Sequence, residues 1–301
     1  MSAVQSQSRS APEACQACDQ QNWEFAFRKS TADFWRCKGC GFVRQFPLPT
    51  DEELHEHYKQ IHETGICSLY LKNEEMRKRI FDHWWSLLES AMPKGQKGKL
   101  LDVGCSSGIQ MEVAQAHGWD VYGVEPTQES AQRAKKRFGA RIFEGFLHDA
   151  KYPDNHFDCA ILFDVFEHLP NPGPIFDEVF RVLKPGGWIA ITTADTGTMI
   201  GKGLGKNWFL YIPHEHLFYC NRENMTLFLK RRGFAVRRIR RAVKQMSLDY
   251  AIGALRFLGP GLHTLLKAPL ALLPKKLKES YMPLYGGEML VMAQKSDSKA
   301  P

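Results

Sequence analysis

The chain has 301 residues, of which 44% are apolar, so it is long enough for one large domain with additions or for two domains with a real core. Its net charge of +7 is moderate and by itself gives little support for a polyanionic partner. The first fourteen residues contain no apolar run, and no stretch reaches the roughly 18 apolar residues of a spanning helix, so we expect a cytoplasmic protein without a signal peptide.

Two Cys-x-x-Cys pairs follow an N-terminal tail, residues 1–13, that we expect to be disordered. The pairs are Cys15/Cys18 and Cys37/Cys40. Because cytoplasmic thiols stay reduced, this spacing favours four thiolates around one zinc ion over disulfides, and four reduced structural thiols are the alternative. Four protein ligands leave no open position for water, so we expect a structural zinc ribbon over residues 14–49. Aromatic residues between the pairs should form its core: Trp23, Phe25, Phe27, Phe34 and Trp35.

Residues 50–99 read as a helical segment. Thr50 and Glu53 occupy the positions of a capping box at the start of one helix. The stretch from Asn73 to Met92 has apolar residues at helical spacing, which predicts a second, longer helix. Three histidines lie in charged, helical surroundings, which favours a solvated surface over a second metal site: His55, His57 and His62.

The stretch Leu100–Gly108 reads as a buried strand, a tight glycine turn and the start of a helix. Gly104 and Gly108 lack a Cβ atom, so a ligand can lie against the backbone there. Ser106 or Ser107 can cap the helix that follows, whose positive end faces the same place. Such a strand–loop–helix unit forms a nucleotide-type pocket at the carboxyl end of its strand.

Strands and helices then alternate, which predicts parallel pairing. The expected strands span residues 100–103, 121–124, 141–143, 157–163, 188–192, 233–241 and 288–293. Glu125 follows the second of these strands, about 20 residues beyond the glycine loop, where a carboxylate suits the two hydroxyls of a ribose. A dinucleotide dehydrogenase would show Gly-x-Gly-x-x-Gly, whereas Ser106 stands here in place of the middle glycine.

Four motifs in a fixed order identify a family. They are Leu-Asp-Val-Gly-Cys-Ser-Ser-Gly, Gly-Val-Glu-Pro, Phe-Asp leading to Asp-Val-Phe-Glu-His-Leu, and Leu-Lys-Pro-Gly-Gly. In this order they resemble the class I S-adenosylmethionine-dependent methyltransferases. The resemblance implies an α/β fold with a doubly wound, mostly parallel, seven-stranded Rossmann-like sheet, here preceded by the zinc ribbon.

The same resemblance implies S-adenosylmethionine as the cofactor and a set of residues around it. This set is Asp102, Gly104, Cys105, Gly108, Glu125, Phe146, Leu147 and Asp164. The residues of the glycine loop would line the methionine and ribose side, and Glu125 would bridge the ribose hydroxyls. Phe146 and Leu147 would flank the adenine, and Asp164 would lie at the lip beside the sulfonium.

Residues 198–224 depart from regular periodicity and read as a lid over a substrate pocket. Because the pKa of histidine lies near neutrality, His214 or His216 can accept a proton from an acceptor hydroxyl or carbon acid. Glu215 can orient an imidazole or hold a sugar hydroxyl. The alternative is that one histidine only anchors the loop. Within the lid, residues 201–206 are rich in glycine and lysine but lack the phosphate-loop spacing, so we expect a mobile loop.

The run Glu215-His216-Leu-Phe, together with the zinc ribbon, resembles sugar methyltransferases that act on deoxysugars carried by a nucleotide. The resemblance implies that Glu215 contacts the substrate and that His216 is the base. Pro213 stands where that group has a tyrosine, and the additional C-terminal domain of its carbon-methylating members is missing, so the resemblance leaves the methylated atom open. We therefore expect methyl transfer to a small polar, glycosyl-type acceptor.

Residues 247–283 are apolar, broken by prolines and cationic near their end, at Lys275, Lys276 and Lys278. Such a segment can contact a membrane surface or a lipid-linked substrate, cover the pocket, or form a dimer contact. Two other functions remain open. The chain could be an RNA-binding methyltransferase or a silent interaction module. An RNA-binding protein would use the zinc ribbon and an arginine cluster: Arg231, Arg232, Arg237, Arg238, Arg240 and Arg241.

Overall fold

The computed structural model describes residues 14–50, 53, 70, 73–252, 264 and 272–296. The expected disordered tail at 1–13 lies outside the described residues, as do His55, His57 and His62. No helix within the described ranges is long and apolar enough to cross a membrane.

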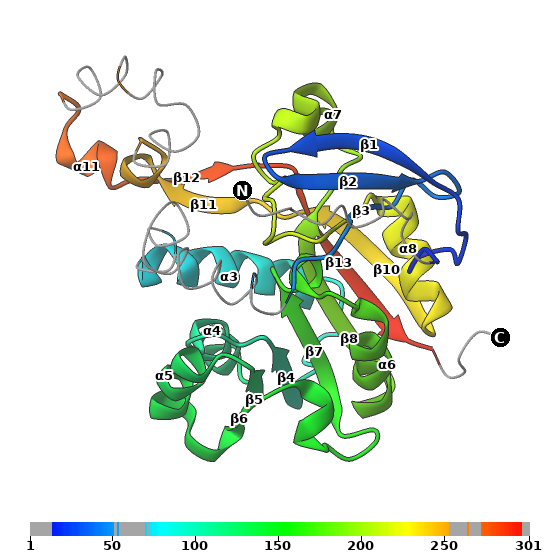
Figure 1. Cartoon of the computed structure of the whole chain (residues 1–301). Coiled ribbons are helices and arrows are strands. Elements are labelled where there is room, and N and C mark those ends of the chain that lie inside the picture. Colours follow the sequence, from blue (N-terminus) through cyan, green and yellow to red (C-terminus); the bar gives the residue numbers. More distant parts are fainter. Residues whose placement is uncertain are drawn as a thin grey trace.

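The central sheet has seven strands in the order β10-β13-β8-β7-β4-β5-β6 (Figure 1). Their bounds are Lys99–Val103 (β4), Asp120–Glu125 (β5), Ile142–Glu144 (β6), Phe157–Phe163 (β7), Leu183–Ala194 (β8), Phe234–Arg241 (β10) and Glu288–Lys295 (β13). The pairs from β6 to β8 are parallel, whereas β13 is antiparallel to both β8 and β10. The predicted doubly wound, mostly parallel sheet is confirmed.

Helices cover both faces of this sheet. Their bounds are Glu74–Glu89 (α3), Ile109–Ala116 (α4), Gln128–Phe138 (α5), Pro172–Val182 (α6) and Arg222–Arg231 (α8). One apolar core joins α3 and α4 to one face, and a second joins α6 and α8 to the other. Strand β7 serves both cores: Cys159, Ile161 and Phe163 enter the first, and Ala160 and Leu162 enter the second. Period-two alternation in an almost wholly apolar strand is what a doubly covered sheet requires.

A second sheet has the order β1-β2-β3-β9 and is antiparallel throughout. Its strands are Trp23–Lys29 (β1), Ala32–Cys37 (β2), Val43–Gln45 (β3) and Phe218–Tyr219 (β9). The first three belong to the predicted zinc ribbon, but β9 comes from the lid. The ribbon and the lid therefore share one sheet. The prediction of a five-residue aromatic core is wrong for Phe25, which is 53% exposed and touches Trp35 edge-on.

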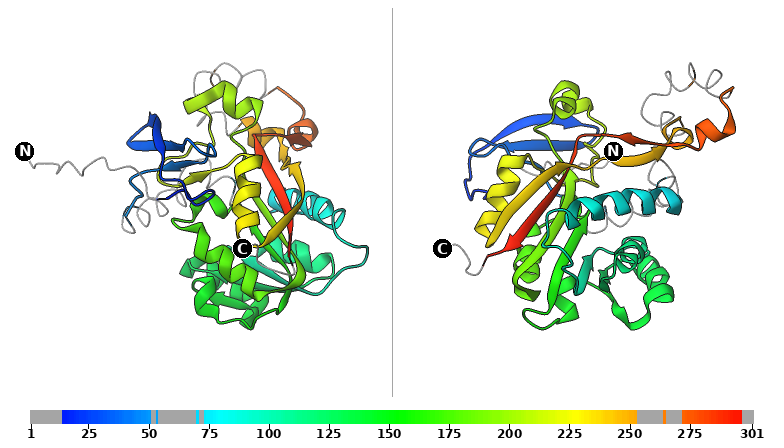
Figure 2. Two further views of the ribbon diagram at one scale, coloured as in Figure 1. Left: turned by 90° about the vertical axis from the view of Figure 1, so that its right-hand side faces the viewer. Right: turned by 180° about the vertical axis from the view of Figure 1, so that it is seen from behind.

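A two-stranded hairpin of Lys244–Ser247 (β11) and Tyr281–Leu284 (β12) forms the base of the C-terminal insertion. Figure 2 shows the hairpin and Lys275–Lys278 (α11) projecting beyond α3 at one side of the molecule. The indole nitrogen of Trp84 on α3 donates to the carbonyl of Val243 at 3.0 Å. The insertion is thereby fixed against the α/β core at the point where it begins.

Short helical turns complete the described chain. They are Gly139–Arg141 (η1), Leu147–Ala150 (η2), Phe166–His168 (η3), Met199–Leu204 (α7) and Gly205–Asn207 (η4). The prediction of a loop at 201–206 is wrong, because α7 and η4 cover these residues and Thr198 caps α7 by accepting from the Gly201 amide at 3.0 Å. The buried Trp208 then ties the following turn to the carbonyl of Gly286.

The two predicted helix caps have different outcomes. The capping box is confirmed, since the amide of Thr50 donates to Glu53 at 2.8 Å and the amide of Glu53 donates to the Thr50 hydroxyl at 3.2 Å. The serine cap of α4 is wrong. Gly108 is the N-cap, in the left-handed region at φ 83°, and no side chain caps the helix. Because the turn itself needs this φ, the glycine takes the position a serine would need.

Candidate active site

The glycine loop joins β4 to α4 and is bonded to the end of β5. The amides of Gly104 and Cys105 both donate to the carbonyl of Val124, at 2.9 and 3.1 Å. Gly104 has φ 76°, and a Cβ atom there would lie 2.8 Å from a methyl group of Val165. A Cβ atom on Gly108 would lie 2.8 Å from the ring of Phe138. Both glycines are thus required by backbone conformation and by close packing.

Glu125 ends β5 beside this loop. Its two carboxylate oxygens accept from the amides of Ser106 and Thr127, each at 2.9 Å. Each carboxylate oxygen has a second lone pair, so the side chain can hold the loop and still accept from ribose hydroxyls. The predicted position of Glu125 at the carboxyl edge of the sheet is what the structure shows.

Two other predicted cofactor residues lie below the loop rather than on its surface. Asp102 is fully buried, and burial, followed by the charge of Glu125, raises its pKa well above the usual range. The amide of Gln110 lies 3.0 Å from its carboxylate. Cys105 is buried against Gly123, where an added Cβ atom would come within 2.7 Å of the sulfur. In this structure the two side chains support the loop, and their contact with a cofactor remains a prediction.

The predicted adenine contacts lie at the end of β6. Phe146 is 56% exposed and its ring is parallel to that of His148 at 5.9 Å, whereas Leu147 is buried. An exposed ring beside a buried aliphatic residue gives a flat apolar surface, which a purine base can contact. These contacts also remain predictions.

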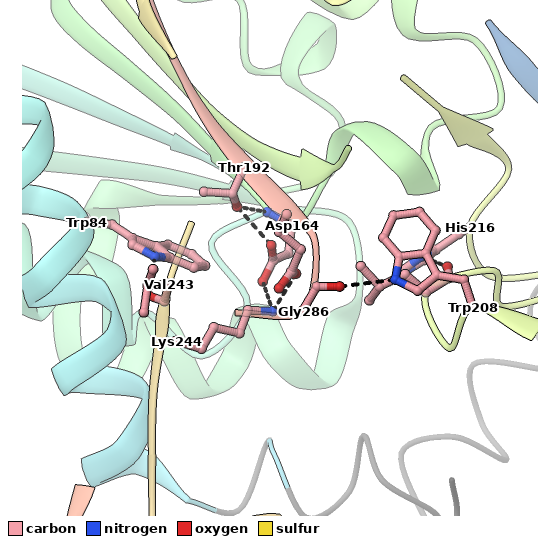
Figure 3. Close-up of polar contacts among 10 residues, drawn as sticks. Trp84, Asp164, Thr192, Trp208, His216, Val243, Lys244 and Gly286 are labelled. Carbon is pink, nitrogen blue, oxygen red and sulfur yellow. Dashed lines mark hydrogen bonds and ion pairs between the residues drawn. The ribbon is translucent and has the colours of Figure 1, made fainter. Parts of the chain in front are cut away.

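Asp164 follows β7 in the left-handed region, at φ 56°. Thr192 of β8 fixes it, because the Thr192 hydroxyl accepts from the Asp164 amide and donates to its carboxylate, both at 2.8 Å. The ammonium group of Lys244 lies 3.5 Å from the other carboxylate oxygen and 2.7 Å from Glu288 (Figure 3). These three charges come from separate strands that meet at one edge of the sheet.

Sequence reasoning missed Lys244 and Glu288. Both are largely buried, with side-chain exposures of 15% and 8%. Burial lowers the pKa of Lys244, but the charges of Asp164 and Glu288 outweigh that effect and raise it well above the usual range. The available signal was Glu288 itself, a carboxylate that opens an otherwise apolar strand at the same edge of the sheet.

The acid–histidine cluster consists of Glu167, His168 and His216. Their carboxylate oxygen and ring nitrogens lie within 4.8 Å of one another, and the two imidazoles meet edge-on with centroids 4.8 Å apart. Burial, followed by the charge of Asp164, raises the pKa of Glu167 to about 8. Burial, followed by His168, lowers the pKa of His216 to about 4. The sequence motif contained His168, but only the fold shows that it faces the lid.

The lid histidines have different surroundings. Nδ1 of His216 lies 2.9 Å from the carbonyl of Leu210 (Figure 3), so that nitrogen donates and Nε2 keeps the lone pair. His214 turns to the N-terminal ribbon instead: its Nε2 lies 2.7 Å from the Thr31 hydroxyl, and its amide donates to Gln45 at 2.9 Å. His214 thus has the contacts of a loop anchor. Glu215 is buried beside His216, and its charge favours the imidazolium.

The four ribbon cysteines converge as predicted. All four sulfurs lie within 4.8 Å of one another, with Cys15 to Cys40 at 3.6 Å and Cys18 to Cys37 at 3.5 Å. Tetrahedral zinc with bonds of 2.3 Å places its sulfurs about 3.8 Å apart. The donor set and its spacing therefore fit one zinc ion.

The arginine cluster is divided among contacts within the chain. Arg231 pairs with Asp19, and the guanidinium of Arg232 lies 3.8 Å from the centre of the Phe228 ring. Arg238 lies 3.4 Å from the carbonyl of Ser90. These contacts tie three of the six arginines, two at the end of α8 and one on β10, to the ribbon, to α8 itself and to the end of α3.

Comparisons with known proteins agree with this geometry. The profile of a family described as "Methyltransferase domain" matches residues 73–239. The ubiquinone biosynthesis O-methyltransferase of Thiobacillus denitrificans is 29% identical over 32% of this chain and 44% of its own length. The sterol 24-C-methyltransferase of Yarrowia lipolytica is 30% identical over 40% of this chain and 33% of its own length. The matches thus span less than half of these relatives.

The solved structures include a SAM-dependent methyltransferase from Archaeoglobus fulgidus. It matches with a TM-score of 0.48 and 16% identity, over 75% of this chain and 99% of that one.

Proposed function

Because the chain belongs to the methyltransferase domain family, we propose that it transfers a methyl group from S-adenosylmethionine to a small polar acceptor. The family membership and the seven-stranded sheet confirm the class of domain predicted from the sequence. The observation that carries the proposal is the meeting of three features at one edge of the sheet. They are the glycine loop, Asp164 and the acid–histidine cluster. The loop adjoins the other two because Val165, which lies between Asp164 and Glu167 in the chain, packs on Gly104.

On the donor side, S-adenosylmethionine supplies an electrophilic methyl group on a sulfonium, so in-line placement of the acceptor carries much of the rate. Glu125 would hold the ribose hydroxyls with the lone pairs that the loop amides leave. Asp164 and Glu288 place two carboxyl groups around the single ammonium group of Lys244, and this excess of acidic groups favours a sulfonium cation beside them.

On the acceptor side, His216 is the general base. The bond to Leu210 fixes the ring and leaves Nε2 to accept the proton. The low pKa keeps the ring neutral at pH 7, and the charges of Glu215 and Asp164 favour the imidazolium that then forms. His214 contributes by anchoring the lid to the ribbon through Thr31 and Gln45.

The acceptor that we propose is glycosyl-type and is methylated on oxygen or carbon. Glu215 and the acid–histidine cluster offer hydrogen-bonding groups, which suit the hydroxyls of a sugar ring. The names of the relatives include both an O- and a C-methyltransferase, so we propose either an oxygen or a carbon atom as the methylated atom.

The ribbon cysteines would bind one structural zinc ion, which would hold β1 to β3 as the support for the lid strand β9. All four ligands come from the protein, so the ion would have no open position for substrate. Because β3 of the ribbon pairs with β9 of the lid, loss of this ion would also loosen the lid on the acceptor side.

A membrane surface is the setting that we propose for a lipid-linked acceptor. Leu272 and Leu277 are 87% and 46% exposed, and α11 carries three lysines between and beside them: Lys275, Lys276 and Lys278. We expect co-sedimentation with phosphatidylglycerol vesicles but not with phosphatidylcholine vesicles. Changing the three lysines to glutamate should abolish it, whereas Lys38, Lys94 and Lys136→Glu should not. Absence of sedimentation with both lipids would refute the membrane proposal.

The test of the function itself is a search for the methylated product. Purified protein and S-adenosylmethionine are added to a cell extract freed of small cofactors, and mass spectrometry follows metabolites that gain one methyl group. A deuterated methyl donor should move the same peak by the mass of three deuterium atoms. Failure to bind S-adenosylmethionine in calorimetry would refute the proposal outright.

A further inference from the structure

The glycine- and lysine-rich run 201–206 has no part in the proposed methyl transfer, yet it forms one wall of a pocket of about 450 Å³. The residues of the run that line this pocket are Gly201, Lys202, Gly205 and Lys206. The ribbon contributes Phe27 and Arg36, and α8 contributes Arg222 at its N-terminus. We call it the ribbon–lid pocket. Its volume is typical of small-molecule sites, so it can hold an organic ligand rather than only a bare ion.

Positive charge dominates the lining of the ribbon–lid pocket. Its basic residues are Arg36, Lys202, Lys206 and Arg222, and its acidic residues are Asp195 and Glu223. Arg222 is balanced by Asp195, whose carboxylate lies 3.2 Å from the guanidinium. Among the residues that the structure describes, no carboxylate forms an ion pair with the other three basic side chains. Three cations thus face the single carboxylate of Glu223, and this excess favours an anionic ligand.

Tyr211 is an independent observation that points to an acceptor group in the same pocket. It lines the pocket and is 5% exposed, and its hydroxyl makes no hydrogen bond to the described part of the chain. Burial raises the pKa of Tyr211 to about 12, and the charge of Arg36 opposes this rise, so the hydroxyl keeps its proton and lies near the guanidinium. Buried hydroxyls usually have a hydrogen-bond partner. A phosphate oxygen beside Arg36 would be such a partner.

The backbone around the pocket is also open to a phosphate group. Four glycines line the pocket, namely Gly41, Gly197, Gly201 and Gly205. Because they lack side chains, a ligand can approach the backbone closely there. The N-terminus of α8 reaches the same pocket, and the positive end of its dipole favours an anion. These features act together with the cations and the tyrosine hydroxyl, which are groups that bind phosphate in other proteins.

We propose that the ribbon–lid pocket binds the phosphate group of an organic phosphate ester through Arg36, Lys202 and Lys206. The hydroxyl of Tyr211 would donate a hydrogen bond to the phosphate, and the ring of Phe27 would contact the organic part of the ligand. This inference goes beyond the proposed function, because no step of methyl transfer uses these residues. Since the ribbon and the lid supply different walls of the pocket, the bound ligand would join them.

Tyr219 connects the pocket with the acceptor side of the candidate active site. The centroid of its ring lies 4.5 Å from that of Tyr211 and 6.1 Å from that of His216. The phosphate can therefore belong to the acceptor itself, with the glycosyl part directed to His216, or to a separate ligand that stiffens the lid. Both sources present the same group to the pocket.

Calorimetry with inorganic pyrophosphate and glucose 1-phosphate tests the pocket independently of methyl transfer. A triple variant, Arg36→Gln with Lys202→Gln and Lys206→Gln, should weaken the binding of both probes by more than about 30-fold, because it removes three charge-assisted contacts. Tyr211→Phe should weaken binding by about 3- to 10-fold. Glu223→Gln should strengthen binding by about 2- to 5-fold, since it removes the opposing charge.

The matched control is a second triple variant on exposed residues outside the pocket: Arg133→Gln, Lys94→Gln and Lys136→Gln. It makes the same change in net charge and should alter both affinities by less than about twofold. Circular dichroism, a melting curve and the affinity for S-adenosylmethionine establish that each variant is folded. Equal losses in the two triple variants, or a wild type that binds neither probe, would overturn the inference. Loss of S-adenosylmethionine binding alone would instead contradict the proposed function.

Inhibition and hydrogen exchange distinguish the two sources of the phosphate. If it belongs to the acceptor, glucose 1-phosphate should inhibit methyl transfer competitively with the acceptor, and the triple pocket variant should raise the KM for the acceptor. If it belongs to a separate ligand, glucose 1-phosphate should slow hydrogen exchange of the lid amides and change kcat rather than KM. Either result supports the site, whereas the absence of both effects would overturn its connection with the lid.

Discussion

The two sides of the candidate active site are built in different ways. The donor side comes from consecutive elements, β4, the glycine loop, α4 and β5, so its residues lie close together in the sequence. The acceptor side combines η3, the lid and the ribbon strands, which are joined only by the fold. Local packing dominates the first, and long-range contacts dominate the second. Substitutions on the donor side should therefore weaken cofactor binding, whereas substitutions on the acceptor side should slow methyl transfer and leave cofactor binding largely unchanged.

The largest effect is expected at Gly104. In Gly104→Val, the new Cβ atom alone would lie 2.8 Å from a methyl group of Val165. The valine backbone would also have to adopt φ 76°, which a branched residue strongly disfavours, so the loop must move. We expect binding of S-adenosylmethionine to fall by more than about 1,000-fold in calorimetry, a loss of roughly 4 kcal/mol. Zinc content should stay at the wild-type value, because the ribbon is separate from this loop.

Gly203→Ala is the control for that substitution. An added Cβ atom there meets no atom within 4 Å, and Gly203 lies within α7. Its affinity for the cofactor should equal that of the wild type. Retained binding by Gly104→Val would mean that the loop is not the cofactor site.

The next largest effect is expected on the other side, from removal of the metal. Cys37→Ser, or treatment with a chelator, should release one zinc per chain and loosen β1 to β3. Because β9 pairs with β3 at Val43 and Arg44, the amides of the lid should then exchange hydrogen faster. Transfer should fall by more than about 100-fold while cofactor affinity changes little. Unchanged exchange in the lid after zinc loss would separate ribbon from lid and contradict the shared-sheet argument.

The same contrast explains what the sequence could reveal. The strand bounds of β7, the capping box at Thr50 and the four cysteines depend on residues near in the chain, and spacing alone located them. The joining of β9 to the ribbon depends on two residue pairs whose members are about 175 positions apart in the sequence, for which no local pattern exists. Lys244 was missed for a related reason: the role of an isolated basic residue becomes clear only when its burial and its neighbours are known.

A smaller effect distinguishes the two lid histidines. His216→Ala should retain cofactor binding and lower turnover by about 100- to 10,000-fold, the range for loss of a general base. His214→Ala removes the contact with Thr31 and should lower turnover by less than about tenfold. Steady-state rates on the identified acceptor, with calorimetry on each variant, provide the comparison. Similar rates for both variants would remove the assignment of His216 as the base.

The smallest effect is on stability and comes from Glu167. Its folded pKa of about 8 lies above the ordinary glutamate value of 4.5, so the folded state holds a proton that the unfolded chain releases, and stability falls as pH rises between these two values. His216 has the opposite sign, because its folded pKa of about 4 lies below 6.5, and stability is lost as pH falls between those values. Below pH 6.5 the effects of Glu167 and His216 on the free energy of unfolding oppose each other. Between about pH 6.5 and 8 only Glu167 contributes, so the free energy of unfolding falls as pH rises. Denaturant unfolding should show a decline of roughly 1 kcal/mol per pH unit there in the wild type and none in Glu167→Gln. An equal decline in both proteins would show that another group titrates, and the raised pKa would then not belong to the acid–histidine cluster.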